Sequence, residues 1–327
     1  MASKLSWLVD SFYVHDDGTI EDRMELKLEL YNKSTGYGWI HLGGKSPETR
    51  DWLLGNSGIE EIWIDALLAK ETRPRFVKIS SDSFFINLRG INSFNKEEPE
   101  DMISIRLYIT KNQIISTKMR DLKAVDKLKK DFLTDNLPKT TSEFLLGLIE
   151  HINDEIETTI IEIHNEIDDL EELALTEHDK DFRQDVIDIR RQMIIFRRYL
   201  FPNLDVLHQL LVMDSFFETD SELRSNLLES GHKMTRFTEE IVSIRERAQV
   251  VHEELNNHLT ERLSASTNKL SVVATIFLPM SFITGLFGVN LAGIPGAEGS
   301  NSFAIFAIVT LAILIIQILI FRWFKWF

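Results

Sequence analysis

The stretch LSVVATIFLPMSFITGLFGVN, residues 270–290, decides the fold of this chain because it contains no charged side chain. The charge-free interval extends from Lys269 to Glu298, which is long enough for a membrane-spanning helix of about 20 residues. A second charge-free interval follows, and its core FAIFAIVTLAILIIQILIF, residues 303–321, is also long enough to span. The sequence therefore predicts two transmembrane helices after roughly 270 residues of soluble character.

Small and polar residues recur along the first span at alternating steps of three and four. This spacing places them on one stripe of a helix. Such a stripe fits either close packing between helices or a water-filled pore, and the residues alone leave both readings open. Its members are Ser264, Thr267, Ser271, Ala274, Leu278, Ser281 and Gly285.

The end of the first span resembles the signature of a known family. The segment TIFLPMSFITGLFGVN, closing on Gly288, Val289 and Asn290, is similar to that of the CorA-type metal-ion transporters, whose first membrane helix ends in Gly-Met-Asn. The Gly-Val-Asn form, with LAGIPG at residues 291–296, resembles the ZntB zinc-transporter branch more. The resemblance continues through residues 115–128, 190–202 and 247–263, whereas the first hundred residues match only loosely.

The resemblance implies a homopentamer with a central pore lined by the first span. The α/β domains and long helices would then form a cytosolic funnel, and the Gly288-Val289-Asn290 turn would be the external selectivity turn. There Asn290 would present a ring of side-chain carbonyl oxygens, a neutral site suited to a hydrated ion. The substrate implied is a divalent cation, zinc, with coupling to protons. Neither span contains an ionisable residue that could carry a proton.

Two other functions remain open. One is a CorA-like channel for magnesium, cobalt or nickel, against which Val289 and the turn at residues 291–296 argue. The other is a membrane anchor that transports nothing and serves as a sensor or scaffold. The polar stripe argues against an anchor, because an anchor would be uniformly apolar.

Composition excludes several other classes of function. The net charge of −15 disfavours nucleic-acid binding, which needs clustered Lys and Arg. The absence of cysteine excludes disulfides and thiolate metal sites.

The Gly44-Lys45-Ser46 sequence is not a phosphate-binding loop, because Trp39 occupies the position of the required first glycine. We expect no enzymatic activity and no cofactor besides the transported cation.

Charge placement predicts the topology. The expected external loop, residues 290–302, holds only Glu298, whereas Arg322 and Lys325 follow the second span. Positive residues stay inside, so both termini and the basic tail, residues 322–327, are expected in the cytoplasm of a bacterial cell with the spans in the inner membrane. The first residues lack the long apolar core of a signal peptide.

The fold class expected is α+β, with a cytosolic α/β domain over residues 1–135. Strands are expected at 5–9, 39–42, 76–79, 84–88, 103–109 and 113–117, the last two forming a hairpin around Lys111-Asn112. Ser46 and Pro47 predict a helix start, as N-cap and first helical residue, with the helix ending near Gly55. A second helix is expected at 59–69.

An antiparallel pair of long helices is expected over residues 136–220. The stretch from Thr140 to Asp179 has apolar residues at helical spacing, thirteen acidic residues and no Lys or Arg. The next helix, from about 181 to 217, carries Arg183, Arg190, Arg191, Arg197 and Arg198. We expect ion pairs between these two helices, while a surface that concentrates cations is compatible with the same pattern.

A third helix is expected to run from Ser221 through residue 289, with its membrane part at about 269–288. Its length of roughly 100 Å implies a bundle within or between chains. An apolar stripe at near-heptad spacing predicts contact with parallel neighbours in an oligomer; it consists of Phe237, Ile241, Ile244, Ala248, Val251, Leu255 and Leu259. Continuing the small-residue stripe toward the N-terminus gives an acidic stripe, Glu239, Glu246 and Glu253, that either meets solvent or attracts cations.

The histidines give no strong metal signal. No pair is spaced four residues apart. His164 with Asp168, and His151 with Glu155, could chelate a metal across one helical turn, but solvated side chains are the expectation on helices this acidic.

Overall fold

The computed structural model describes residues 7–22, 36–70, 72–92, 100–134, 136–176, 182–213, 221–288 and 299–323. The chain divides into two compact units, Met1–His252 and Glu253–Phe327. The helices are α1 (Pro47–Asn56), α2 (Glu61–Leu68), α3 (Lys123–Asp131), α4 (Thr141–Thr176), α5 (Arg183–Leu211), α7 (Ser221–Phe287) and α8 (Ser302–Trp323).

Within the described residues of the first unit, seven strands form one mixed sheet in the order β2-β1-β3-β7-β6-β5-β4. Neighbouring strands are antiparallel except β3 and β7, which pair in parallel from Gly38↔Gln113 to Gly43↔Lys118. The expected hairpin around Lys111-Asn112 is confirmed as β6 and β7. The strands are β1 (Leu8–Val14), β2 (Ile20–Asp22), β3 (Tyr37–Gly43), β4 (Arg75–Lys78), β5 (Ser83–Gly90), β6 (Ile103–Thr110) and β7 (Gln113–Lys118).

The start of β3 depends on a glycine. Gly36 has a φ of 98°, and a Cβ atom there would lie 2.2 Å from the carbonyl oxygen of Val14. A side chain would clash with β1, and L-residues rarely adopt this φ. Only glycine therefore lets the chain enter β3 beside β1.

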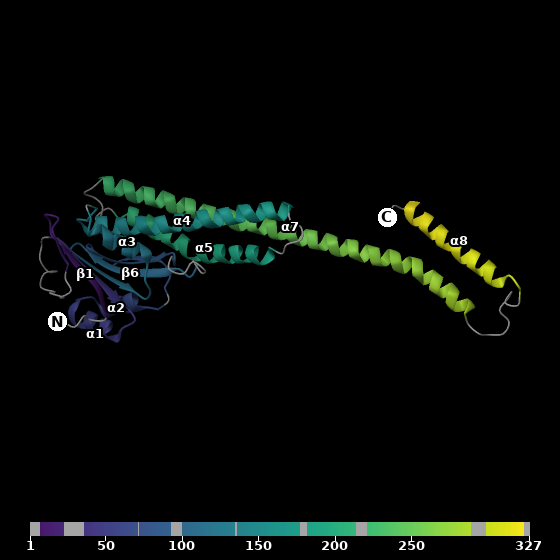
Figure 1. The fold of residues 1–327 in the computed structure, drawn as a ribbon. Coiled ribbons are helices and arrows are strands. Elements are labelled where there is room, and N and C mark those ends of the chain that lie inside the picture. Colours follow the sequence, from purple (N-terminus) through teal and green to yellow (C-terminus); the bar gives the residue numbers. More distant parts are fainter. Residues whose placement is uncertain are drawn as a thin grey trace. The chain divides into compact units, whose positions relative to one another are not determined.

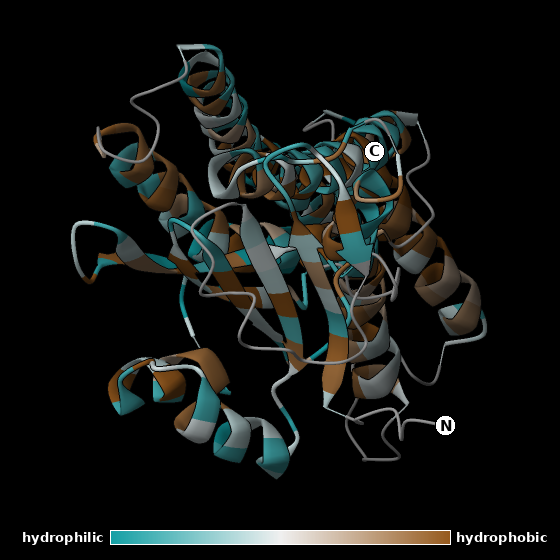
Figure 2. Cartoon of the chain, turned by 90° about the vertical axis from the view of Figure 1, so that its left-hand side faces the viewer, coloured by the Kyte–Doolittle hydropathy of each residue, from teal (hydrophilic) through white to brown (hydrophobic). Residues whose placement is uncertain are grey.

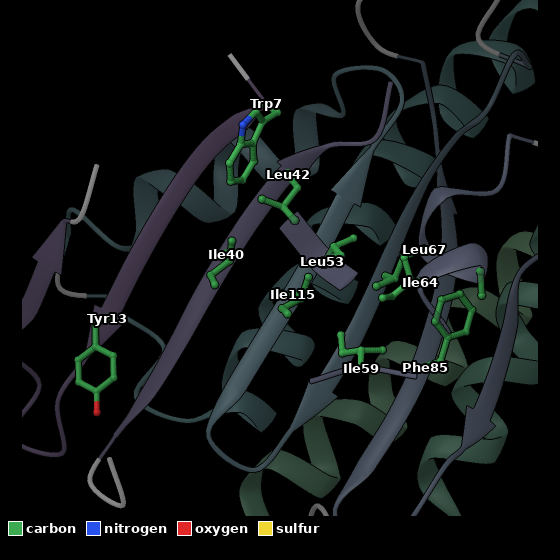
Figure 3. Packing of buried hydrophobic residues seen from close by; sticks show 11 residues of the cluster. Trp7, Tyr13, Ile40, Leu42, Leu53, Ile59, Ile64, Leu67, Phe85 and Ile115 are labelled. Carbon is green, nitrogen blue, oxygen red and sulfur yellow. The ribbon is translucent and has the colours of Figure 1, made fainter. Parts of the chain in front are cut away.

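Helices α1 and α2 cover one face of the sheet. Leu53 of α1 and Ile64 and Leu67 of α2 are fully buried against side chains from β3, β5 and β7, as Figure 3 shows. Burial of each such side chain contributes about 1.5–3 kcal/mol. The predicted N-terminal boundary of α1 is confirmed, with Ser46 as N-cap residue and Pro47 next, although the Ser46 hydroxyl donates to Glu48 rather than to a backbone amide.

Aromatic rings join the other face of the sheet to the long helices. The Trp39 ring of β3 lies 4.8 Å from the Phe144 ring of α4 and 5.2 Å from the Phe132 ring beyond α3. The Trp39 indole nitrogen donates to the Ser116 hydroxyl at 2.8 Å, so its polar atom is satisfied although buried. Figure 2 shows both apolar and polar segments along the strands. Successive residues of β3 and β5 are buried, so both faces of the sheet are covered there.

The helices α4 and α5 and the first part of α7 lie side by side in Figure 1. The ion pairs expected between α4 and α5 are wrong within the described residues, because the carboxylates of α4 pair with α3 and α7 instead. Lys127 of α3 binds Glu155, and Arg236 and Arg247 of α7 bind Glu157 and Glu171. Burial and the nearby acidic residues of α5, Asp185 and Asp188, raise the pKa of Glu166.

Several predicted boundaries are wrong. The strand expected at 5–9 corresponds to β1, which extends to Val14, while residues 1–6 lie outside the described residues. Strand β2 and helix α3 were not expected. Helix α5 ends at Leu211 rather than near residue 217. Aromatic and polar residues alternate weakly in β1. The buried residues Ala124, Val125 and Leu128 of α3 have helical spacing, but the helix has only nine residues, so its pattern was overlooked.

The second unit consists of the last part of α7 and of α8. Both helices are long and apolar enough to span a membrane, by length and composition. The Phe287 and Phe306 rings lie 5.4 Å apart, so the two helices are in contact near their connected ends. Nearly all other apolar side chains of α8 are exposed in the single chain, as expected for segments that face lipid or further copies.

Candidate ion pathway

The apolar stripe of α7 is buried within the chain. Phe237, Ile241, Ile244, Ala248 and Val251 are all at most 4% exposed. Their assignment to contacts between copies is therefore wrong, since an antiparallel bundle in one chain uses the same spacing as a parallel oligomer. Only the end of the stripe remains available, because Leu259 is 40% exposed.

The acidic stripe of α7 lies on the outward side of the same helix. Glu239, Glu246 and Glu253 are exposed, as are Ser243 and Val250 between them. Arg245 approaches Glu246 only to 4.0 Å, a distance too long for a hydrogen bond. The exposed side of α7 thus offers carboxylates to solvent or to a neighbouring copy.

The small-residue stripe of α7 is exposed along its full length in the single chain. Its seven members are Ser264, Thr267, Ser271, Ala274, Leu278, Ser281 and Gly285. The stripe is therefore open to whatever surrounds the chain.

The hydroxyl groups of this helix fall into two kinds. Thr267, Thr275 and Thr284 donate to backbone carbonyls one turn earlier, at 2.8–2.9 Å. Within the described residues, the hydroxyls of Ser264, Ser271 and Ser281 have no hydrogen-bond partner. In a membrane such groups need water or a neighbouring chain, so Ser271 and Ser281, which lie in the expected membrane part, mark the side of the helix that is not lipid-facing.

The space available for a side chain differs between the two glycines near the end of the helix. A Cβ at Gly288 would lie 2.9 Å from the Thr284 carbonyl oxygen, so the helix end itself requires glycine. A Cβ at Gly285 would meet nothing within 4 Å. The fold of the single chain therefore does not require glycine at position 285.

The sequence interpretation overlooked Pro279, which lies inside α7 next to Leu278 of the stripe. Proline has no N–H, so the Thr275 carbonyl oxygen loses its helical donor. A freed carbonyl at membrane depth is tolerated where water or protein satisfies it. A proline within an apolar run of the sequence could have predicted this free carbonyl oxygen.

The structure describes Gly288 at the end of α7, but Val289 and Asn290 lie outside the described residues. Their roles in the selectivity turn stay predictions, as does the placement of the loop that follows them.

His164 and His151 both approach a carboxylate of another helix, whereas His258 lies 3.2 Å from Glu254 of its own helix. His164 Nδ1 lies 2.5 Å from Glu240 of α7 and its Nε2 lies 3.6 Å from Asp168. His151 Nε2 lies 2.6 Å from Asp131, so the pair with Glu155 is not formed. In the described ranges there is no group of three metal-ligating side chains that could hold an ion.

Comparison with known proteins agrees with this architecture. Residues 34–325 match the family described as CorA-like Mg²⁺ transporter protein. The divalent cation transporter CmaX of Pseudomonas aeruginosa is 36% identical over 263 residues, 80% of this chain and 78% of that protein. The zinc transport protein ZntB of Yersinia enterocolitica is 31% identical over 258 residues, 79% of this chain and 78% of that protein.

Solved structures show the same fold. The structure of full-length CmaX superposes with a TM-score of 0.83 at 30% identity, and it covers all of both chains. The CorA magnesium transporter of Methanocaldococcus jannaschii, at 19% identity, has a TM-score of 0.80 over 96% of this chain and 98% of that one. With a mixed-sheet domain, one long helix and two apolar C-terminal helices, this chain belongs to the CorA-like Mg²⁺ transporter family.

Proposed function

We propose that this protein carries divalent metal cations, with zinc as the principal substrate, through a central pore formed by the membrane part of α7 in a homopentamer. The observation that carries the proposal is the exposed stripe of Ser264, Ser271 and Ser281, whose hydroxyls have no partner among the described residues. Two apolar helices cannot enclose a polar path alone, whereas several copies around an axis can. The stripes of all copies would then face one water-filled bore.

The chemistry of the stripe favours an ion that keeps part of its water. It offers hydroxyl and carbonyl oxygens but no carboxylate or imidazole. Zinc stripped of water prefers imidazole, thiolate or carboxylate ligands, so it would cross such a pore hydrated. The names of the relatives support both parts of the proposal, CmaX for divalent cations and ZntB for zinc.

A magnesium channel is the second candidate. The family description names Mg²⁺, and a neutral oxygen-lined pore suits an ion that loses its water reluctantly. Asn290 at the external turn would accept hydrogen bonds from the water of either ion. The proposed topology places both termini in the cytoplasm and the spans in the inner membrane, from the positive charges after the second span.

The test is a flux assay with the purified protein in liposomes. Zinc uptake is measured with and without a pH gradient, and magnesium, cobalt and nickel are added as competitors. Zinc flux that magnesium does not suppress supports the first candidate, and magnesium flux that zinc does not suppress supports the second. Liposomes that contain correctly assembled protein yet remain tight to all four ions would refute transport and leave the anchor function.

A further inference from the structure

We propose that the outward face of α5 is the surface through which one copy of this chain binds helix α4 of the next copy, so that successive contacts close the ring. This inference rests on the homo-oligomer of the proposed function and names the contact that builds its soluble part.

The outward face of α5 carries apolar and basic residues at alternating steps of four and three. It consists of Ile187, Arg191, Ile194, Arg198 and Phe201, and we call these residues the α5 seam. Its apolar members are well exposed: Ile187 at 41%, Ile194 at 57% and Phe201 at 37%. The opposite side of the helix, including Met193 and Phe196, is fully buried. Exposed apolar residues at this spacing are typical of a helix that packs against a second helix.

The charges of the seam have no acidic partner in the part of the chain that the structure describes. Within the part of the chain that the structure describes, Arg191 and Arg198 form no ion pair with a carboxylate, and neither do Arg190 and Arg197. The Arg197 guanidinium lies over the Phe201 ring at 5.4 Å, and that of Arg198 over Tyr199 at 5.6 Å. These stacked guanidiniums keep their outer N–H groups available, so the seam fits an acidic partner.

Helix α4 of a second copy has the matching chemistry. Between Thr141 and Thr176 it has eleven acidic residues and no Lys or Arg. Glu162, Asp169 and Glu172 are exposed and form no ion pair among the described residues. Ile161, at 55% exposure, adds an apolar residue to the outward side. Charge complementarity therefore selects α4 of another copy as the partner of the seam.

The levels of the two helices also agree. Helices α4 and α5 are consecutive and run in opposite directions, as Figure 1 shows. Asp185 and Asp188 of α5 lie close enough to Glu166 of α4 to act on its carboxylate, so the first turns of α5 are level with Glu166. Counted from there in opposite directions along the two helices, Ile194 of α5 is level with the exposed Thr158 of α4. A rotation axis along the helices preserves level, so it brings Ile194 of one copy opposite Thr158 of the next.

Such a contact joins two different surfaces and is therefore heterologous. A heterologous contact repeated by rotation closes into a ring, whereas a contact of α5 with itself gives only a dimer. The number of copies follows from the angle between successive copies rather than from the seam itself.

Cysteine cross-linking in the full-length protein tests the contact, because the native chain contains no cysteine. The Ile194→Cys/Thr158→Cys double variant, oxidised in the membrane, should give a ladder of covalent species on a denaturing gel that ends at the closed ring. Each single variant should stay monomeric. Ile194→Cys paired with Ser243→Cys, on the exposed acidic side of α7, is the matched control and should give no ladder.

Three results would overturn the proposal. Dimers from Ile194→Cys alone would show that α5 binds α5, and a ladder from the Ser243→Cys pair would assign the partner to α7. Full labelling of Ile194→Cys by a hydrophilic thiol reagent in the assembled oligomer, with protection only on vesicles containing phosphatidylglycerol, would assign the seam to lipid. Metal flux measured on the same preparations separates the two proposals, because retained flux without the ladder refutes the seam and leaves the transport function standing.

Discussion

The Nε atom of Arg247 on α7 donates to Oε1 of Glu171 on α4 at 2.8 Å. A second nitrogen of the same guanidinium binds Glu171 Oε2 at 2.6 Å and also contacts Asp168. The planar fork of arginine suits this bidentate pairing. One guanidinium thus fixes the register between two helices that are far apart in sequence.

We predict that Arg247→Met lowers the thermal stability of the purified protein by an amount equivalent to at most about 1 kcal/mol, because the pair is partly exposed. Arg247 lowers the pKa of Asp168 in the folded protein. The stabilisation from this pair is therefore present at pH values above the pKa of Asp in the unfolded chain, and it is lost as the pH falls through the lowered pKa of Asp168 in the folded protein. Thermal melts from pH 7 to pH 3 measure it. Arg245→Met is the control, and a difference between the variants that grows in acid would contradict the prediction.

Glu166→Gln should stabilise the protein slightly at pH 7. Burial, then Asp185 and Asp188, raise the pKa of Glu166, so its ionised form costs stability at neutral pH. The cost disappears as the pH falls through that raised pKa, because the folded state then binds the proton. We expect a gain of about 0.3–0.5 kcal/mol, as for other like-charge pairs. Chemical unfolding at pH 7 and pH 4 measures it, with Glu162→Gln as control; an equal gain at both pH values would argue against this cause.

Asn290→Ala should abolish metal flux while the oligomer keeps its normal size. The amide carbonyl at this position would accept hydrogen bonds from water on the entering ion, and alanine has no such group. Flux in liposomes and size-exclusion chromatography in detergent measure the two properties. Asn301→Ala in the same loop is the control and should transport normally. Wild-type flux through Asn290→Ala would remove the residue from the selectivity turn.

The Glu246→Gln/Glu253→Gln variant should transport several-fold more slowly at low ionic strength and nearly normally in high salt. Exposed like charges around a bore focus a negative potential that gathers cations, and salt screens it. Initial rates at a series of salt concentrations measure this dependence. A reduction that is the same at every salt concentration would point to direct coordination of the ion instead.

Ser281→Cys should react with a hydrophilic thiol reagent in the intact membrane, and the reaction should block flux. The hydroxyl of Ser281 has no partner among the described residues, as expected for a side chain facing water. Ile283→Cys, on the other side of the helix, is the control and should not react. Protection of Ser281→Cys until the protein is unfolded in detergent would instead place the stripe between packed helices.

Sequence periodicity predicted the long helices well because each has many turns, so the helical spacing of its apolar residues repeats many times. The 67 residues of α7 and the two spans were expected within a few residues of their observed limits. Periodicity did not reveal which neighbour covers a stripe. The apolar residues Phe237 to Val251 have the spacing of an oligomer seam, yet they are buried in their own chain. Spacing is a property of one helix, whereas burial depends on what packs against it.

Charge composition was a weaker guide than periodicity. The acidic α4 and basic α5 suggested mutual ion pairs, but Arg236 and Arg247 of α7 satisfy carboxylates of α4. A net count cannot show which side of a helix a charge occupies. Likewise, the difference between Gly285 and Gly288 appears only when a Cβ is placed on the folded backbone. The stripe on α7 could be predicted from sequence, whereas its exposure and the contrast between the two glycines required the structure.

The parallel pairing of β3 with β7 has a consequence for the order of folding. Strands β2, β1 and β3 form an antiparallel group with β1 in the middle, strands β4–β7 form an antiparallel meander, and among the described strands the pairing of β3 with β7 joins the two. On a ribosome the first group is complete when residue 43 emerges, but its exposed edge must wait until residue 118 is available. Closing so long a loop is slow compared with closing a hairpin. During that interval the apolar edge of β3 is open to other nascent chains, so insertion of β7 is the step at which this domain is most exposed to aggregation.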